Sequence, residues 1–375
     1  MTIFISAGEA SGDAYGAALL NEMKSIRRQG FSAFAVGGKK LREAGATLVA
    51  DSSHWGAISI VQALKVAPRI LLGARKVKRA LATIEPGLFI PIDFGYANIR
   101  LARHAKKHGW KVLYFIPPGS WRRDRQGKDL PEVTDEIVTP FPWSAEMLQS
   151  MGASAHFFGH PIKQMMRQPE GPVERIQNRI AVLSGSRRHE IKENLPVVAR
   201  ALRGEEVAEF AVAPSTDLAW LQGLWARLAP HRSADLFTRA DVAGVLRRSQ
   251  AAIVCSGTAT LEAALCRCPM VVIYRLTKLM EFEARLLKTR PRFVSLPNIV
   301  LEREVVPELI QADASPSNVR RELDLLLEDG PSRAAQLKSF EELDALLGPA
   351  DAIARAAQLA LSLLLEGQKT DVRGT

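Results

Sequence analysis

Cysteine is scarce in this sequence: 375 residues include only Cys255, Cys266 and Cys268. An odd number in so long a chain argues against a disulfide framework and is typical of a reducing cytoplasm. A single residue separates Cys266 from Cys268, with no histidine nearby, whereas paired zinc ligands are usually further apart. We therefore expect no disulfide, no metal site and no bound cofactor.

Long apolar runs are also missing. No stretch reaches the ~18 uninterrupted apolar residues that a membrane-spanning helix needs. The chain starts Met-Thr-Ile-Phe-Ile-Ser, without a basic region or a cleavage site of small residues, so we expect no signal peptide. Together with the few cysteines, this predicts a cytoplasmic location.

Signatures of nucleic-acid-binding domains are absent, and so is the Gly-x-x-x-x-Gly-Lys pattern of a P-loop ATPase. What the chain does have is positive charge, with 50 Lys and Arg against 40 Asp and Glu. A net charge of +10 attracts anions such as nucleic acid, anionic lipid or a phosphorylated substrate. Without a nucleic-acid signature, we expect no nucleic acid among the partners.

Short β-rich runs alternate with longer helical patterns, which is typical of α/β proteins with parallel sheets covered by helices. The first half contains a predicted helix, Asp13–Gln29, with Leu19, Met23 and Ile26 on one face. Its predicted strands are Ile3–Ser6, Ser32–Val36, Leu88–Ile92, Lys111–Phe115 and Glu136–Val138. The second half has predicted strands at Ile180–Leu183, Glu209–Ala213, Ala234–Phe237, Ala251–Cys255 and Met270–Tyr274.

This pattern predicts two Rossmann-like domains, residues 1–168 and 173–348, that face each other across a cleft. The Pro/Gly-rich stretch from Gly159 to Pro172 is the expected linker. His160 lies in it; of the lone histidines it is the first candidate for a functional role, and we favour the alternative that it fixes a turn. Residues 349–375 should form a helix and a tail, packed on the first domain or on a dimer partner.

The turn after the first predicted strand, Ala7–Asp13, combines small residues with an acid. Small residues let the backbone approach a ligand closely, and the next helix offers free N–H groups. Glu9 is a candidate catalytic acid in this turn. The candidate loop contacts are Gly8, Ser11 and Gly12. The alternative is a plain turn in which Ser11 or Asp13 caps the helix.

Asp93 directly follows the apolar run Leu88–Ile92. A carboxylate at the end of a buried parallel strand lies where ligands bind and can accept a proton from a hydroxyl. Asn98 and Arg100, a few residues later, are candidate acceptor contacts. The alternative is that Asp93 caps a helix beginning near Ala97.

Two turns in the second half suit a diphosphate. Ser184–Glu190 offers backbone donors, Ser186 and the guanidinium of Arg187, although it could equally be a solvated basic loop. Cys255–Glu262 places small and hydroxyl residues before a helix, where a diphosphate could bind. The alternative is that these residues only cap the helix and bind no ligand. Its candidate donor-binding residues are Ser256, Gly257, Thr258, Thr260 and Glu262, the last for a ribose hydroxyl pair.

Two further segments are of interest. In Ser295–Asn298, the Asn298 side chain could form hydrogen bonds with amide and hydroxyl groups of a ligand. The alternative is that this segment is only a loop turn. Gln62–Ala82 predicts a basic amphipathic helix with Pro68 in its first turn. Such a helix can lie on an anionic membrane, or simply pack its apolar side on the core. Its candidate membrane contacts are Lys65, Arg69, Leu71, Leu72, Lys76 and Arg79.

These motifs, in this order, resemble those of the lipid-A-disaccharide synthases, which are inverting glycosyltransferases of the GT-B type. The resemblance extends from Ala7–Asp13 to Val306–Gln311 and so covers most of the chain. It implies that the functionally important positions are Glu9, Asp93, Arg187 and Asn298. It also implies a protein peripheral to the inner membrane, and a homodimer.

The resemblance implies condensation of UDP-2,3-diacylglucosamine with 2,3-diacylglucosamine 1-phosphate, giving lipid A disaccharide 1-phosphate and UDP. Three segments of the first half depart from the family pattern, namely Asp93–Asn98, Pro117–Arg123 and Pro140–Pro142. The sequence therefore specifies the UDP-sugar donor more closely than the acylated acceptor. The alternatives are another UDP-sugar enzyme of this fold, such as an epimerase or another glycolipid synthase, and a non-catalytic membrane-binding homologue.

Overall fold

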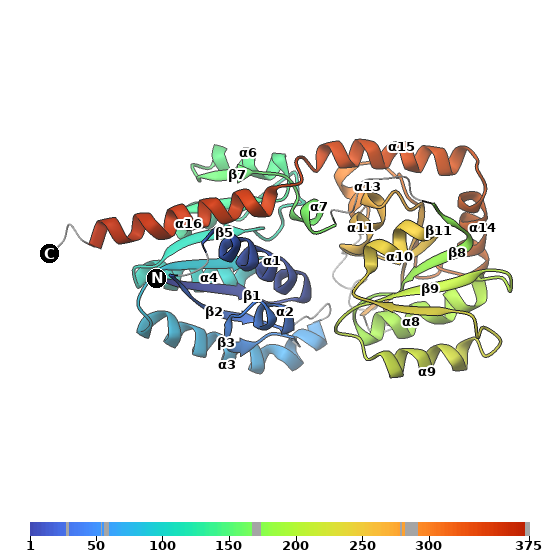
Figure 1. Ribbon diagram of the computed structural model, residues 1–375, viewed down its shortest axis with the longest axis horizontal. Helices are drawn as coiled ribbons and strands as arrows, with labels where there is room; N and C mark the ends of the chain where they lie inside the picture. The colour runs from blue at the N-terminus through green and yellow to red at the C-terminus, as the bar shows by residue number, and fades with distance from the viewer. Residues whose placement is uncertain are drawn as a thin grey trace. The chain divides into compact units, whose positions relative to one another are not determined.

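The computed structural model divides the chain into two compact units (Figure 1). Unit 1 comprises Met1–Met165 and Leu347–Thr375, and unit 2 comprises Met166–Leu346. The structure describes residues 1–27, 30–53, 55, 60–166, 174–277, 280–281 and 292–371. It describes no side chains for residues 60–65, 96 and 367–371. The later part of the expected linker, Gln168–Pro172, lies outside the described residues.

Unit 1 is built on a parallel sheet with the strand order β3-β2-β1-β4-β5-β6-β7. The strands are β1 (Thr2–Ala7), β2 (Ser32–Gly37), β3 (Thr47–Asp51), β4 (Leu88–Ile92), β5 (Lys111–Phe115), β6 (Glu136–Thr139) and β7 (Ala155–Phe157). The chain moves outward from β1 to β3 and then returns to place β4 beside β1. This reversal is the topological switch point, outside which open α/β sheets bind their ligands.

The helices of unit 1 are α1 (Ala10–Ile26), α2 (Lys39–Glu43), α3 (Ile60–Thr83), α4 (Gly95–Lys107), α5 (Leu130–Val133), α6 (Pro142–Ser150), α7 (Pro161–Met165) and α16 (Ala352–Asp371). The sequence predicts Pro68 in the first turn of this helix. That prediction is wrong: Pro68 lies inside α3, because the helix already begins at Ile60. Among the described residues, no helix has the length and apolar character needed to span a bilayer.

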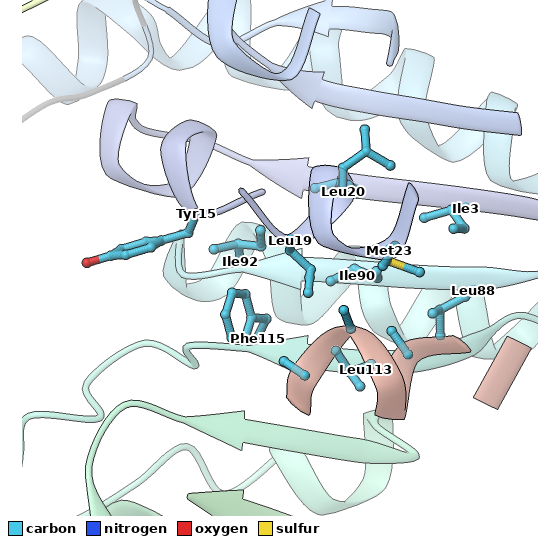
Figure 2. Close-up of a cluster of buried hydrophobic side chains, with 14 of the residues drawn as sticks. Ile3, Tyr15, Leu19, Leu20, Met23, Leu88, Ile90, Ile92, Leu113 and Phe115 are labelled. Carbon is cyan, nitrogen blue, oxygen red and sulfur yellow. The ribbon is translucent and has the colours of Figure 1, made fainter. Parts of the chain in front are cut away.

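One face of the unit 1 sheet is covered by α1 and α16 (Figures 1 and 2). Leu19 and Met23 of α1 are fully buried against β1, β4 and β5, as the helical periodicity predicts. Ile26, predicted on the same face, is 48% exposed because α1 ends there. The small residues Ala356, Ala357 and Ala360 let α16 approach this core closely.

The other face of the unit 1 sheet is covered by α3 and α4. Val77 and Leu81 of α3 are buried in a cluster with aromatic residues of the sheet. Trp110 lies edge-on to Phe4, with ring centroids 6.3 Å apart, and its indole N–H donates to Leu81 O at 2.8 Å. This packing fixes one side of α3 on the core and leaves the other side outward.

Unit 2 has a parallel sheet in the order β10-β9-β8-β11-β12-β13, and its switch point lies between β8 and β11. The strands are β8 (Ile176–Leu183), β9 (Val207–Val212), β10 (Leu236–Arg239), β11 (Ser249–Cys255), β12 (Met270–Tyr274) and β13 (Glu308–Ile310). The helices are α8 (Arg188–Ala201), α9 (Leu218–Leu228), α10 (Val242–Arg248), α11 (Ala259–Leu265), α13 (Leu296–Leu301), α14 (Pro316–Leu327) and α15 (Pro331–Leu346).

Candidate active site

Glu9 and Asp93 follow the two strands that flank the switch point of unit 1. β1 and β4 pair with Ala7 opposite Ile92, so the segments after these strands leave the sheet side by side. The negative charge of Glu9 acts on the Asp93 carboxyl. The two candidate catalytic acids are therefore brought together at the edge where the strands end, the carboxyl edge.

Asn98 holds the two strand ends together. Its side chain is fully buried, and its Oδ1 accepts a hydrogen bond from Ser6 Oγ at 2.7 Å. Its Nδ2 lies 3.0 Å from each of three backbone carbonyl oxygens, those of Ser6, Ile92 and Asp93. The amide of this predicted acceptor contact is thus used inside the protein, where it fixes the position of the Asp93 backbone.

The backbone turns sharply at Asp93. Asp93, Phe94 and Gly95 have φ angles of 46°, 59° and 46°, a left-handed conformation that is uncommon for residues other than glycine. Asp93 N–H donates to Ile116 O at 3.0 Å, and Tyr114 Oη donates to Asp93 O at 2.8 Å. Strained residues of this kind persist where their surroundings fix them, often at active sites.

Asp93 does not cap α4. The helix begins at Gly95 with Phe94 as its N-cap residue, so the alternative of a cap for a helix near Ala97 is wrong. The Asp93 side chain is exposed, yet neighbouring protein atoms displace enough water to raise its pKa. This loss of surrounding water first, and the charge of Glu9 second, raise the pKa of Asp93 to about 6, against a smaller opposing effect of the Phe94 N–H. A carboxylate with a pKa near neutrality suits a general base.

The glycine-rich turn fits closely behind these acids. A Cβ at Gly8 would collide with the Phe94 ring, and Gly12 packs against Ala7. Helix α1 begins at Ala10 with Glu9 as N-cap, so neither Ser11 nor Asp13 caps it; Ser11 is half-buried in the first turn. The Asp13 carboxylate instead accepts bonds from the N–H groups of Gly38 (2.6 Å), Lys40 (3.0 Å) and Leu41 (3.2 Å).

The remaining predicted acceptor contact, Arg100, lies elsewhere. It is on the exposed side of α4 and lines a hollow together with Lys78 of α3. Arg100 lies five positions after Gly95, which places it roughly 7.5 Å along the helix axis from the start of α4.

The Gly-Ser-Arg turn of unit 2 follows β8 at its switch point and closes on Glu190. Oε2 of this buried carboxylate accepts the N–H groups of Ser186 and Arg187, each at 3.1 Å. Its Oε1 lies 3.0 Å from Arg187 Nη1. Gly185 has a φ of 111°, and a Cβ there would lie 2.7 Å from Glu190. The turn is rigid, with Ser186 exposed and Arg187 half-buried.

The turn after β11 lies beside it, because β8 and β11 pair with Leu183 opposite Val254. Two of its hydroxyls are used within the protein: Ser256 Oγ donates to Val294 O at 2.7 Å, and Thr260 Oγ1 donates to Gly257 O at 2.8 Å. Gly257 is exposed, with a φ of 144° and open space where a Cβ would be. Thr258 and Glu262 are half-buried at the start of α11.

Asn298 is fully buried and holds the neighbouring loop. Its Oδ1 accepts from the N–H groups of Val305 (2.8 Å) and Val306 (3.0 Å), and its Nδ2 donates to Val306 O and Glu308 Oε1, each at 2.9 Å. Leu296, two residues before Asn298 in α13, donates its N–H to Thr260 Oγ1 at 3.3 Å. The helix that carries Asn298 is thus bonded to the turn after β11.

Helix α3 extends over Ile60–Thr83, so the helix predicted at Gln62–Ala82 is confirmed. Leu71 and Leu72 are 61% and 57% exposed. The other candidate membrane contacts with described side chains, Arg69, Lys76 and Arg79, are exposed too, and that of Lys65 lies outside the described side chains. Val77 and Leu81 pack on the core, as the alternative expects, whereas Leu71 and Leu72 do not.

Comparison with known proteins decides the family. The sequence pattern of the lipid-A-disaccharide synthetase family matches residues 3–361. The lipid-A-disaccharide synthase of Anaeromyxobacter dehalogenans is 37% identical, over 96% of this chain and 97% of its own. That of Koribacter versatilis is 32% identical, over 92% of each chain. This chain belongs to the lipid-A-disaccharide synthetase family.

As a member of the lipid-A-disaccharide synthetase family, the protein is a glycosyltransferase of lipid A synthesis. Its fold is that of GT-B enzymes. MurG of Acinetobacter baumannii has a TM-score of 0.56 at 13% identity, over 96% of this chain and 99% of its own. A structure of MnaA from S. aureus with UDP has a TM-score of 0.63 at 12% identity, over 97% and 98%. Both likenesses concern the fold alone.

Three positioning residues escaped the sequence analysis. Ser6 and Tyr114, buried in strands, gave no signal of their bonds to the Asp93 turn. Glu190 gave no clear signal either, because the capping-box signature begins with Ser or Thr, whereas the N-cap residue here is Arg187. His160 was interpreted correctly: its N–H donates to Leu347 O at 2.7 Å, and its Nδ1 accepts from Ile162 N–H at 3.2 Å. Burial lowers the pKa of His160 to about 3.

Proposed function

We propose that this glycosyltransferase condenses UDP-2,3-diacylglucosamine with 2,3-diacylglucosamine 1-phosphate to form lipid A disaccharide 1-phosphate and UDP. The observation that carries the proposal is Asp93, a carboxylate at the unit 1 switch point with a pKa raised to about 6. Its turn is fixed by Asn98 and Tyr114, and Glu9 supplies the neighbouring charge.

The proposed reaction is a single inverting displacement. Asp93 takes the proton of the acceptor hydroxyl, and the oxygen forms a bond to the anomeric carbon of the donor sugar. The bond from that carbon to the diphosphate oxygen breaks, and UDP leaves with the electron pair. A positioned general base contributes about 10²–10⁴-fold to such a step.

The leaving UDP would be bound by unit 2. The open backbone at Gly257, the half-buried Thr258 and the N-terminus of α11 offer donors to a diphosphate, and Arg187 offers a cation. Ser186, also a predicted contact, is exposed in the same turn, while Glu262 is the residue proposed for the ribose. Ser256, Thr260 and Asn298 would act by holding the turn in shape.

The test of the reaction is incubation with both proposed substrates, followed by chromatographic separation and mass analysis of the products. We expect disaccharide and UDP in equal amounts, and no sugar-containing product when the acceptor is omitted. Release of a free or epimerised sugar without acceptor would contradict the transferase and favour the epimerase alternative.

The donor site has its own test in Arg187→Ala. Removing the cation should weaken UDP binding about tenfold in calorimetry, because charge-assisted bonds to phosphate are lost. Arg188→Ala is the matched control, since the neighbouring guanidinium stacks on Trp220 at 4.6 Å from the ring centroid. Equal UDP affinity in both variants would refute the role of Arg187.

We also infer that α3 is the contact of this protein with an anionic membrane surface. The exposed pair Leu71 and Leu72 supports this, with basic residues beside it on the same helix. Each such cation contributes about 1 kcal/mol near an anionic surface. Leu71→Ser with Leu72→Ser should reduce co-sedimentation with anionic vesicles, whereas Leu325→Ser, at a leucine of unit 2 that is 45% exposed, should not. Unchanged sedimentation of the first variant would contradict the inference.

A further inference from the structure

A hollow of about 230 Å³ lies between α3 and α4 and is lined by basic residues. Its lining residues are Lys78, Arg100, Arg103, His104 and Lys107. The four residues from α4 recur at a spacing of three and four, which places them on one face of that helix. His104 Nε2 lies 3.0 Å from Lys78 O and joins the two helices at the hollow.

The hollow concentrates positive charge with little internal compensation. Arg103 pairs with Asp129 at 3.1 Å, and this is the one ion pair of a lining residue among the residues that the structure describes. Burial is the largest cause that lowers the pKa of His104, and the nearby charges of His108, Lys78 and Lys107 lower it further. The hydrogen bond to Lys78 O acts in the opposite direction. Cations that converge on a concave surface repel one another, and a bound anion removes that cost.

The hollow extends along α4 away from the Asp93 turn. Its nearest lining residue on α4, Arg100, lies roughly 7.5 Å along the axis from Gly95, and its most distant one, Lys107, roughly 18 Å. Leu71 precedes Lys78 by seven residues, so the exposed leucine lies on nearly the same stripe of α3, roughly 10 Å away.

We propose that this hollow binds a phosphate monoester, held by the guanidinium of Arg100 and the ammonium groups of Lys78 and Lys107, with Arg103 at its rim. A phosphate monoester carries about −1.5 to −2 charges at pH 7 and three acceptor oxygens, which matches several convergent donors. The monoester can come from a lipid headgroup or from a soluble metabolite, and the nearby Leu71 favours the lipid.

The experiment uses the full chain and two probes, glycerol 3-phosphate in calorimetry and vesicles of neutral lipid with phosphatidate or phosphatidylserine at equal surface charge. The site variant is Lys78→Gln with Arg100→Gln and Lys107→Gln. The matched control is Arg200→Gln with Arg227→Gln and Lys338→Gln, which removes the same charge from exposed positions of unit 2, outside both the hollow and α3. Thermal unfolding and UDP binding, which does not involve these residues, check that both variants fold.

We expect saturable binding of glycerol 3-phosphate, weakened about tenfold in the site variant and little changed in the control. A preference for phosphatidate over phosphatidylserine, lost only in the site variant, identifies a lipid source; binding of the soluble probe alone identifies a metabolite. The absence of binding to both probes, or equal loss in both variants, would overturn the proposal. UDP affinity and turnover are measured in separate assays. Failure of the phosphate-site proposal can therefore be told apart from failure of the proposed transferase function.

Discussion

The two switch points of this protein have the same topology but opposite chemistry. In unit 1 the edge presents acids: Asp93 is exposed in a left-handed turn, and its pKa is raised to about 6 beside Glu9. In unit 2 an amide and a carboxylate at the edge turn inward. Asn298 is fully buried and Glu190 nearly so, and each holds backbone N–H groups.

This difference indicates how the two edges divide the work. An acid that must exchange a proton needs an accessible carboxylate and a pKa near neutrality. A diphosphate site needs rigid backbone donors, so its side chains serve best by fixing the turn. Under the proposed function, unit 1 would carry out the proton transfer and unit 2 the anion binding.

The largest effect that would sharpen this comparison is expected for Asp93→Asn. The amide keeps the shape of the side chain but cannot take a proton, so turnover should fall about 10²–10⁴-fold. UDP affinity, measured by calorimetry, should stay unchanged. Asp51→Asn, at the exposed end of β3 in the same sheet, is the control and should keep near-normal turnover. Near-normal turnover of Asp93→Asn would show that another group is the base.

Asn298→Ala tests the inward-facing side of the comparison. It leaves the buried N–H groups of Val305 and Val306 without their acceptor, which should cost about 3 kcal/mol of unfolding free energy in urea. Asn318→Ala, at a half-buried position in α14, should cost about 1 kcal/mol or less. Loss of UDP affinity at full stability would mean instead that Asn298 contacts the donor directly.

Gly8→Ala probes the close packing behind the acids. The added methyl group collides with the Phe94 ring, so we expect a loss of about 1–3 kcal/mol of unfolding free energy and a fall in turnover. Phe94→Ala in the same chain should recover part of both. Gly223→Ala, at an open position in α9, should instead be neutral or stabilising. A Gly8→Ala variant with wild-type stability would show that the ring can move freely.

The smallest effect concerns the stability cost of Asp93. Because folding raises its pKa from 3.8 to about 6, the ionised carboxylate is disfavoured in the folded state. The contribution of Asp93 to stability should thus become less favourable as pH rises from about 4 to about 6. Asp93→Asn should melt at a slightly higher temperature above pH 6, and the difference should disappear near pH 4. A lower melting temperature at neutral pH would contradict the raised pKa.

Much of the fold could be predicted from the sequence, because buried parallel strands such as Leu88–Ile92 are continuous apolar runs. The strands that escaped prediction, β3, β7 and β13, lie at or beside the outer edges of the sheets, are at most five residues long, and include polar or half-buried residues. Because these strands lack a long apolar run, only their hydrogen bonds to a neighbouring strand identify them as strands.

The candidate site was predictable in its position but less so in the roles of its residues. Glycine-rich and polar turns after strands located both switch points. Whether a side chain faces outward, as for Asp93, or inward, as for Asn98 and Asn298, depends on contacts between segments far apart in the sequence. Ser6 and Asn98 are 92 residues apart, and no local pattern reports that hydrogen bond.

The most direct test of the central claim is the pH dependence of kcat/KM for the wild type and for Glu9→Gln. A general base must be ionised, so the account predicts that kcat/KM falls as pH drops below about 6, the raised pKa of Asp93. Removing the charge of Glu9 should lower that pKa and move the acid limb to lower pH. A profile without an inflection between pH 5 and 7 in the wild type, or an identical profile in Glu9→Gln, would contradict the account.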